Sequence, residues 1–473
     1  MTALHSRYNP HREAERYLSA LSIPSQTRCF ILIEPGLGYM IPILCRRFPG
    51  ARIIALHVEA IPGSTREAEE NTVHWDPSCP RSPEEFLEQE LSASSTTGDF
   101  GAESIRIIEW QPSRDLYGEP YVSLLSAAAV AIRRFDAERR TVRTFGRRWV
   151  RNFFKNLRLL HQFPVYGDVS VPVIVTGAGP SLEKSLPVIG ALKKQHNCFI
   201  IAASSSVMAL LCRGITPDLV LATDGGGWAL LHLYELFRKN STRPPAIAAS
   251  LIAGLPSQCG DLPILGIADG SLWQGLILRG LGIPHLVLPQ RGTVTATALD
   301  LAFALGRGKV CIAGMDLDTQ DIRTHVRPYS FDRLWQEGAS RILSEYSQHF
   351  FRQNSMQGGG SHQIYAQWFS AQLASYPDRL YTLGNNNSLF NPLPPLVPEF
   401  DPAPAPPSPR LIDNAAAGGI VSRGLDILKT ALNDRNTADA LTRELAPLLL
   451  TAGGLWEEIE NLVRPYQAED SHG

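Results

Sequence analysis

The chain has 473 residues, a formal net charge of −2, 44% hydrophobic residues and 19% charged residues. This composition is typical of globular proteins, and the length accommodates two or three domains. The near-neutral charge argues against a dedicated nucleic-acid-binding protein. The seven cysteines are scattered without metal-ligand spacing, which indicates free thiols in a reducing cytoplasm. No apolar core follows the first residues, and the most apolar helical stretch is too short to cross a bilayer, so we expect no signal peptide and no membrane span.

Residues 1–160 are expected to form an N-terminal α/β domain. A strand over 29–33 leads into the turn Gly36-Leu37-Gly38, then an apolar helix and a second strand over 52–58. Many β-α-β units of this kind bind nucleotides or methyl donors. A purely structural domain with a glycine turn explains the same pattern, and we favour that interpretation.

A strand over 105–110 precedes a long helical segment from Tyr121 to about Leu160. Its second half contains eight Arg and Lys residues within 139–158, interleaved with aromatic residues. A helix rich in basic and aromatic residues can bind nucleic acid or an acidic partner. Such a helix more often packs its aromatic stripe and exposes its charges, and we expect packing here.

Residues 161–390 alternate strands and helices, which predicts a mostly parallel sheet with helices on both faces. The strand 173–176 meets the turn Gly177-Ala178-Gly179-Pro180-Ser181, and a helix follows. Glycines let a ligand approach the backbone, and a helix start attracts phosphate. The full dinucleotide fingerprint is absent, because no third glycine follows at the required spacing. The turn is consistent with a nucleotide site or with a plain β–α connection.

Further polar segments follow other strands of this predicted sheet. Ligands lie beyond the carboxyl ends of strands in such sheets, so these segments should meet the glycine turn. The candidates are Ser204 to Ser206, Asp224, the turn Arg291-Gly292-Thr293, and Asp316 to Asp318.

Nine of the twenty residues 391–410 are proline, which predicts an extended linker. Helical stretches over 413–432 and 437–463 predict a helical C-terminal region, 411–473, for docking or self-association. Pro447 should kink or restart the second stretch.

Three segments, in this order, resemble the motility-associated factor (Maf) flagellin glycosyltransferases: VPVIVTGAGPSLEKSLPVI, RGITPDLVLATDGG and RGTVTATALDLAFALGRGKVCIAGMDL. The central domain of that family is also described as 6-hydroxymethylpterin diphosphokinase MptE-like, and these motifs resemble bacterial CMP-sialic-acid sialyltransferases as well. The segments EPGLGYMIPIL and TFGRRWVRNFFKNL resemble the region that precedes this domain. The implied architecture is α/β: a Rossmann-like, mostly parallel central sheet with an N-terminal α/β domain and a C-terminal helical appendage.

The resemblance implies transfer of a nonulosonic acid, of sialic, pseudaminic or legionaminic type, from a CMP-sugar to Ser or Thr hydroxyls of flagellin. Flagellin would be the acceptor and partner, the CMP-sugar the donor substrate, and the cytoplasm the location. No cofactor is expected, with Mg²⁺ left open. Carried over by position, the donor-binding residues would be Gly177, Ala178, Gly179, Pro180, Ser181, Ser204, Ser205, Asp224, Gly292, Thr293, Asp316, Asp318, Asn387 and Ser388.

The resemblance also implies the catalytic residues. Arg291 would hold the phosphate or the sugar carboxylate through its guanidinium fork. His362 or His325 would act as general base, since histidine suits proton transfer near neutral pH. Two positions depart from the sialyltransferase pattern, because Ala178 and Asp224 both stand where those enzymes have asparagine. Their phosphate-binding tyrosines also have no clear counterpart here.

Two other functions stay open. One is a 6-hydroxymethylpterin diphosphokinase that uses ATP and Mg²⁺, with Asp316 and Asp318 as metal ligands. The other is a noncatalytic flagellin-binding or assembly protein built on a transferase domain that has lost its activity.

Overall fold

The computed structural model divides the chain into two compact units. Unit 1 consists of Met1–Arg147 and Leu445–Leu455, and unit 2 of Arg148–Glu444 and Trp456–Gly473. The division falls inside helix α5 (Glu119–Leu157), whereas the sequence analysis placed the first boundary at residue 160. The structure describes residues 4–60, 71–94, 100–238, 244–317, 322–357, 361–383, 393–396, 406–415, 418–451 and 454–470.

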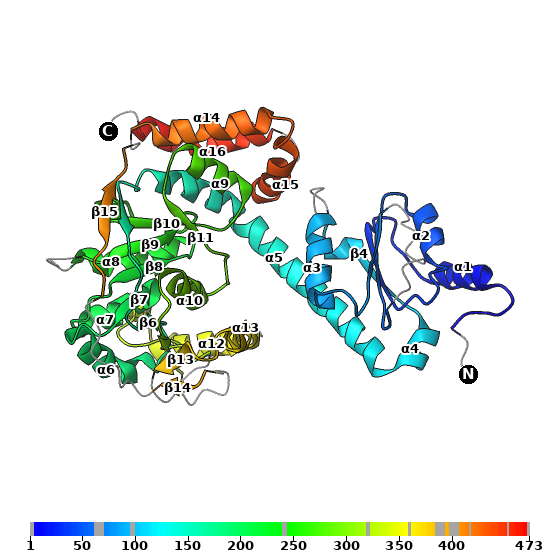
Figure 1. Ribbon diagram of the computed structural model, residues 1–473, viewed down its shortest axis with the longest axis horizontal. Coiled ribbons are helices and arrows are strands. Elements are labelled where there is room, and N and C mark those ends of the chain that lie inside the picture. Colours follow the sequence, from blue (N-terminus) through cyan, green and yellow to red (C-terminus); the bar gives the residue numbers. More distant parts are fainter. Residues whose placement is uncertain are drawn as a thin grey trace. The chain divides into compact units, whose positions relative to one another are not determined.

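Unit 1 is built on a four-stranded parallel sheet in the order β3-β2-β1-β4 (Figure 1). The strands are β1 (Cys29–Ile33), β2 (Arg52–Leu56), β3 (Thr72–Trp75) and β4 (Ile105–Glu109). The helices are α1 (Pro10–Ala20), α2 (Ile41–Arg47), α3 (Pro83–Ser94), α4 (Gln111–Tyr117) and the first part of α5. Strand β3 was not expected, because its segment is polar and only Trp75 is buried in it.

Both faces of this sheet are covered, which explains the unbroken apolar run of β1. Successive side chains of a strand point to opposite faces. Ile31 and Ile33 accordingly pack in the core formed with α3 and α5, while Phe30 and Leu32 pack in the core formed with α1 and α2.

Unit 2 contains, among its described residues, a nine-stranded sheet in the order β11-β10-β9-β8-β7-β6-β12-β13-β14. Every pair in it is parallel, so the expected mostly parallel α/β sheet is confirmed. The strands are β6 (Val173–Thr176), β7 (Phe199–Ala203), β8 (Leu219–Ala222), β9 (Ala246–Ser250), β10 (Ile264–Ala268), β11 (His285–Val287), β12 (Val310–Ala313), β13 (Leu380–Leu383) and β14 (Pro395–Leu396).

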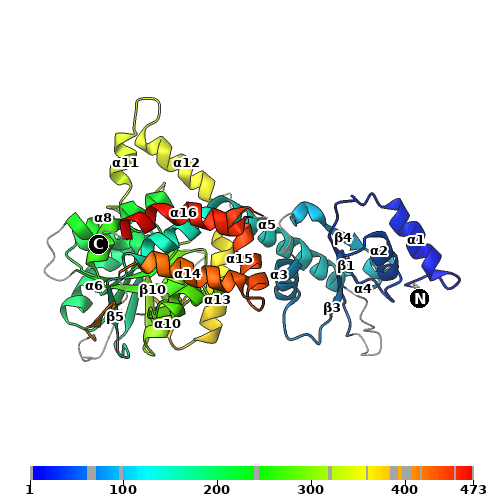
Figure 2. The same ribbon diagram turned by 90° about the horizontal axis from the view of Figure 1, so that it is seen from above.

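Helices pack around this sheet, and a short antiparallel ladder joins β5 (Gln162–Val165) to β15 (Arg410–Asp413). Figure 2 shows α11 and α12 as a hairpin that projects from the rest of unit 2. The helices are α6 (Leu182–Lys194), α7 (Val207–Cys212), α8 (Leu230–Arg238), α9 (Leu272–Gly280), α10 (Val294–Leu305), α11 (Asp332–Glu337), α12 (Glu345–Gln357), α13 (Ser361–Ser375), α14 (Ile420–Asn433), α15 (Ala438–Leu449) and α16 (Leu455–Asp470).

The second part of α5 packs into unit 2, as the packing interpretation of its aromatic residues predicted. Phe153 and Phe154 are fully buried. The side-chain amide of Asn156 donates to the carbonyl oxygens of Leu251 and Ala253, at 2.9 and 2.8 Å. This helix therefore supports the loop after β9.

In unit 2, α14 lies against α9 (Figure 1), whereas the last residues of α15 belong to unit 1. The carboxylate of Glu444 in α15 accepts the backbone N–H of Leu272 at 3.0 Å and of Trp273 at 3.2 Å, and so caps the start of α9. Helix α15 runs through Pro447 and ends two residues later. Among the described residues, no helix is long and apolar enough to cross a membrane.

Candidate functional site

Strand β6 lies between β7 and β12, so the winding of the unit 2 sheet reverses there. Ligands of parallel α/β sheets lie at the carboxyl ends of the strands at such a point. Two glycine turns meet at this edge: Gly177 donates its N–H to Ala313 O, and Gly179 to Gly314 O, each at 2.8 Å. A Cβ added to Gly314, whose φ is +72°, would lie 2.6 Å from Gly177 O. The two turns therefore approach closely because both carry glycine.

Asp316 occupies the start of helix α6. Its buried carboxylate accepts the backbone N–H of Ser181 at 2.7 Å and also the Ser181 hydroxyl. The first N–H groups of a helix have no partner inside it and attract negative charge. The chain thus supplies its own anion at the turn for which the sequence analysis expected phosphate. A bound phosphate would have to displace this carboxylate or lie beside it.

The ends of β7 and β8 add polar groups to the same edge. Ser204 is buried and Ser205 is partly buried. The hydroxyl of Ser206, the last residue of the expected segment after β7, lies 2.8 Å from the Thr176 hydroxyl and links β7 to β6. Asp224 is exposed after β8, and its carboxylate accepts the N–H of Gly226 at 2.7 Å.

The turn Arg291–Thr293 reaches this edge because it opens α10. The Nε of Arg291 donates to Asp300 at 2.7 Å, and its guanidinium lies 5.1 Å from the centre of the Trp368 ring. The Tyr365 hydroxyl donates to Gly292 O at 3.1 Å. Helix α13, which contains His362, therefore lies against the arginine turn. The side chain of His362 lies outside the described part of the structure.

His325 belongs to a second group of side chains beside the glycine turn. The next residue, Val326, donates its N–H to Ala178 O at 2.8 Å. The ring of His325 stacks on Tyr329 at 4.2 Å, and its Nδ1 lies 2.8 Å from the Thr324 hydroxyl. Helix α8 adds His232, whose ring is 5.4 Å from that of Tyr329. We refer to His232, His325, Tyr329, Phe331, Trp335 and His349 as the histidine–aromatic cluster.

Burial governs the protonation of this cluster. It lowers the pKa of both His232 and His325 to about 4. Both rings are therefore neutral at pH 7 and can accept a proton, but they are weak bases in this state. Among the residues that the structure describes, the Nδ1 atoms of the buried His232 and His349 have no hydrogen-bond partner. The sequence analysis missed both, because each is an isolated histidine in a helix without a motif around it.

Comparisons with known proteins show which sequences and folds this chain resembles. A family model described as "6-hydroxymethylpterin diphosphokinase MptE-like" matches residues 147–258. The 6-hydroxymethyl-7,8-dihydropterin pyrophosphokinase of Methanothermobacter thermautotrophicus is 32% identical over 189 residues, which span 37% of this chain and 75% of that protein. The chain belongs to the MptE-like family.

Two further similarities extend beyond the MptE-like region. An uncharacterised protein of Treponema pallidum is 27% identical over 264 residues, and the matched region spans 56% of its length. The structure of a Maf glycosyltransferase from Magnetospirillum magneticum matches 99% of this chain and 82% of its own, with a TM-score of 0.51 and 13% identity. The expected likeness to the Maf proteins is thus confirmed for the fold, and the MptE-like central domain is confirmed by sequence.

Among the described residues, no group of three or more His, Cys, Asp or Glu side chains is placed to hold a metal ion. Both carboxylate oxygens of Asp316 accept hydrogen bonds from Ser181, so this side chain fits a helix cap better than a magnesium ligand. Asp318, Asn387 and Ser388 lie outside the described residues. We therefore derive no step through a metal ion.

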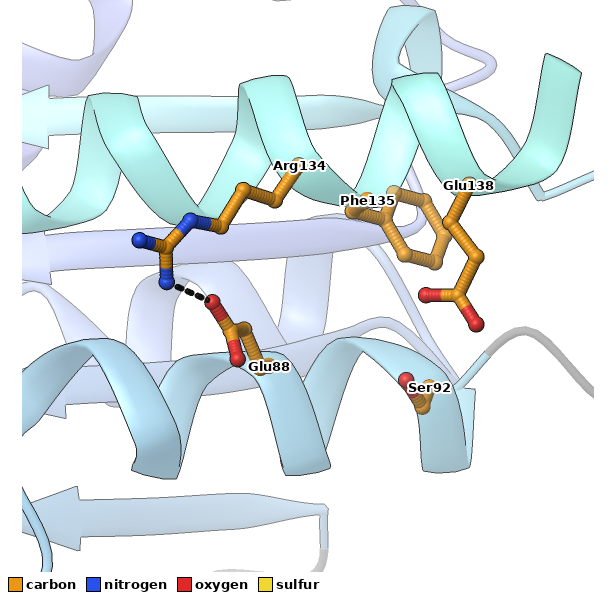
Figure 3. Close-up of a pocket in the computed structure, with 5 residues that line it drawn as sticks. All are labelled: Glu88, Ser92, Arg134, Phe135 and Glu138. Carbon is orange, nitrogen blue, oxygen red and sulfur yellow. Dashed lines mark hydrogen bonds and ion pairs between the residues drawn. The ribbon is translucent and has the colours of Figure 1, made fainter. Parts of the chain in front are cut away.

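A pocket of about 250 Å³ lies in unit 1, between α3 and α5, outside the MptE-like region. Figure 3 shows the ion pair between Arg134 and Glu88, 2.7 Å long, with Glu138 one helical turn further along α5. Burial and the nearby Glu88 carboxylate raise the pKa of Glu138. Two carboxyl groups beside one arginine do not suit a nucleotide phosphate, so this pocket is not the donor site.

The neutral state of His232 predicts a pH-dependent stability. Its folded-state pKa of about 4 lies below the ordinary value of 6.5, so the unfolded chain binds the proton more tightly. Stability falls as pH drops from 6.5 toward 4, by about 2 kcal/mol at pH 5 for this residue. The fall of the urea midpoint between pH 7.5 and pH 5.0 should therefore be smaller in His232→Gln than in the unmodified protein, while the contribution of His325 remains. His196→Asn, at an exposed position of the same unit, should leave the difference unchanged. Equal pH dependence of His232→Gln and the unmodified protein would contradict the assignment.

Proposed function

We propose that this MptE-like protein is a glycosyltransferase that transfers a nonulosonic acid from a CMP-sugar to Ser or Thr hydroxyls of flagellin. The supporting observation is the extent of the structural match. The Maf glycosyltransferase resembles 99% of this chain, whereas the similarity to the pyrophosphokinase spans 37% of it. A kinase that acts on a small molecule does not require unit 1 and the C-terminal helices, whereas the match to the Maf structure includes them. The seven cysteines are free thiols, which supports the cytoplasm as the location.

The proposed reaction uses groups at the carboxyl edge of the unit 2 sheet. The acceptor hydroxyl oxygen forms a bond to the anomeric carbon of the sugar, and the bond from that carbon to the CMP phosphate oxygen breaks. The electron pair leaves with CMP, and the hydroxyl proton passes to a histidine. The guanidinium of Arg291 offers further N–H donors beyond those that bind Asp300, and these would stabilise the phosphate or the sugar carboxylate.

Two histidines remain candidates for the base. His325 is neutral and lies next to the turn Gly177–Gly179, but its pKa of about 4 makes it weakly basic in this state. A phosphate bound nearby would favour the protonated form and raise that value. His362 lies in the helix that contacts Gly292 through Tyr365. The proposal assigns the proton transfer to one of these two histidines, and the reactants are the CMP-sugar and the acceptor hydroxyl.

One observation favours a second candidate function. The relative with 32% identity is named as a 6-hydroxymethyl-7,8-dihydropterin pyrophosphokinase, and the family model that matches residues 147–258 carries a diphosphokinase description. A diphosphokinase would bind a pterin and ATP with Mg²⁺. Asp316 and Asp318 were the metal ligands that the sequence suggested for this function. The engagement of both Asp316 oxygens by Ser181 speaks against that metal site.

The two functions predict different ligands. Calorimetric titration of the protein with CMP, CMP-N-acetylneuraminic acid and ATP in the presence of Mg²⁺ separates them. We expect the cytidine ligands to bind and ATP to bind at least tenfold more weakly, because the transferase site recognises CMP. Magnesium-dependent ATP binding without cytidine binding would favour the pyrophosphokinase. No binding by a folded protein would favour a noncatalytic flagellin-binding protein.

A further inference from the structure

Unit 1 has its own point at which the winding of a parallel sheet reverses. In the order β3-β2-β1-β4, the strands β2 and β3 lie on one side of β1, and β4 lies on the other. The crevice at the carboxyl ends of β1 and β4 is therefore the place where such a sheet binds a ligand. This place lies outside the MptE-like region, and the proposed transferase reaction does not use it.

The backbone after β1 has an unusual conformation. Glu34, Gly36 and Gly38 have φ values of 42°, 61° and 76°. Positive φ is costly for a residue with a side chain, and such outliers cluster at binding sites. The buried Glu34 carboxylate accepts the N–H of Val58 at 2.6 Å and lies 3.6 Å from Nδ1 of His57. These contacts hold the ends of β1 and β2 together and present the turn 36–38 at the crevice.

A flat heteroaromatic ring already occupies this crevice, and it comes from the chain itself. Nε2 of His5 accepts the N–H of Leu37, inside the glycine turn, at 3.0 Å. The imidazole stacks on the buried ring of Trp110 at 5.4 Å and 23°, and it meets the edge of Tyr39 at 5.0 Å. Only 7% of the His5 side chain is exposed. A Cβ at Gly36 would collide with His5 Nε2, so the glycine makes room for the ring.

The end of β2 supplies a carboxylate at the position where dinucleotide-binding sheets hold a ribose. In those proteins an acidic residue follows the glycine turn by about 20 residues and accepts hydrogen bonds from the ribose hydroxyls. Here Glu59 follows β2 and is exposed. Burial and the nearby carboxylates of Glu34 and Glu59 raise the pKa of Tyr117 in α4. The same edge therefore combines an aromatic stacking surface, a glycine-turn N–H and an exposed carboxylate.

We propose that unit 1 contains a second ligand site, for a ribonucleoside, at the carboxyl ends of β1, β2 and β4. The ring of the ligand takes the place of the His5 imidazole against Trp110 and the glycine turn. The ribose hydroxyls donate to Glu59. The segment that carries His5 fills the site until a ligand displaces it.

Titration of the full chain with adenosine, S-adenosylhomocysteine and NAD tests this site, since these probes share a ribonucleoside and differ in what is attached. His5→Ala should bind at least one of them about tenfold more tightly than the unmodified protein, because the competing ring is gone. His5→Gln keeps a hydrogen-bond acceptor without the aromatic ring and should give a smaller gain. Adding Glu59→Gln to His5→Ala should weaken binding about tenfold.

His11→Ala provides the matched control. His11 is exposed and meets the edge of Tyr39 at 4.8 Å, and its partners do not include the glycine turn. Its removal should leave nucleoside binding unchanged. Hydrogen exchange should show protection of residues 35–48 by the bound nucleoside. Binding that protects only unit 2, or no gain in folded His5→Ala and His5→Gln proteins, would overturn the proposal.

Discussion

Arg291→Ala is expected to weaken binding of CMP-N-acetylneuraminic acid by about 100-fold, since it removes charge-assisted hydrogen bonds from a partly buried site. The guanidinium is held by Asp300 and by the face of Trp368, so its orientation is fixed before the ligand arrives. Arg291→Lys keeps the charge but loses the planar fork of the guanidinium. Its affinity for the donor should therefore lie between those of the unmodified protein and Arg291→Ala. Calorimetric titration measures each effect.

Two control variants separate ligand binding from stability. Arg291→Ala leaves the Asp300 carboxylate without its arginine, which lowers stability by itself. Arg291→Ala with Asp300→Ala removes that unpaired charge, and it should recover stability without recovering binding. Arg379 stacks on Phe303 at 4.8 Å and donates to Gly306 O at 2.8 Å, so Arg379→Ala should lower stability and leave binding intact. Full donor binding by a folded Arg291→Ala protein would refute the assigned role.

Gly314→Ala is expected to destabilise unit 2 by about 3 kcal/mol, as the sum of backbone strain and a steric clash. The residue has φ +72°, and its new Cβ would lie 2.6 Å from Gly177 O and 2.8 Å from the Cβ of Leu182. Both atoms belong to elements fixed by the sheet, so neither can move away cheaply. A lower urea midpoint, together with loss of donor binding, is the expected result.

Gly214→Ala is the matched control for this substitution. Gly214 has nearly the same φ, +69°, but nothing lies within 4 Å of the added Cβ. The strain alone should cost about 1 kcal/mol there. An equal loss of stability in Gly314→Ala and Gly214→Ala would show that the added Cβ at Gly314 meets no steric clash. That result would contradict the close approach of the turns at Gly177 and Gly314.

The sequence predicted the central part of the fold well. Strands β1 and β6 have the expected bounds, because each is a short, fully buried and mostly apolar run that is followed by a glycine turn. Strand β3 was missed, since its polar residues carry no apolar pattern and it forms by pairing with β2. The stretch 437–463 was expected to kink or restart at Pro447. Helix α15 continues through the proline to Leu449, and a new helix, α16, starts at Leu455.

The candidate site shows a similar division. The motif at Gly177–Ser181 and the family likeness were visible in the sequence, because a strand, a glycine turn and a helix are consecutive. The pairing of Ser181 with Asp316 joins residues 135 positions apart, and no local pattern encodes it. The histidine–aromatic cluster also required the tertiary structure, since α8 and α12 each contribute one ring from distant parts of the chain to the four rings of the segment after β12 and of α11.

By itself the sequence determined the alternation of strands and helices, the glycine turns and the family, because these depend on local spacing and on consecutive residues. Only the tertiary structure decided what fills each turn. Asp316 takes the start of α6, and His5 takes the crevice of unit 1. Both contacts depend on parallel strands that bring distant segments to one edge of a sheet, where burial then selects which polar groups must pair.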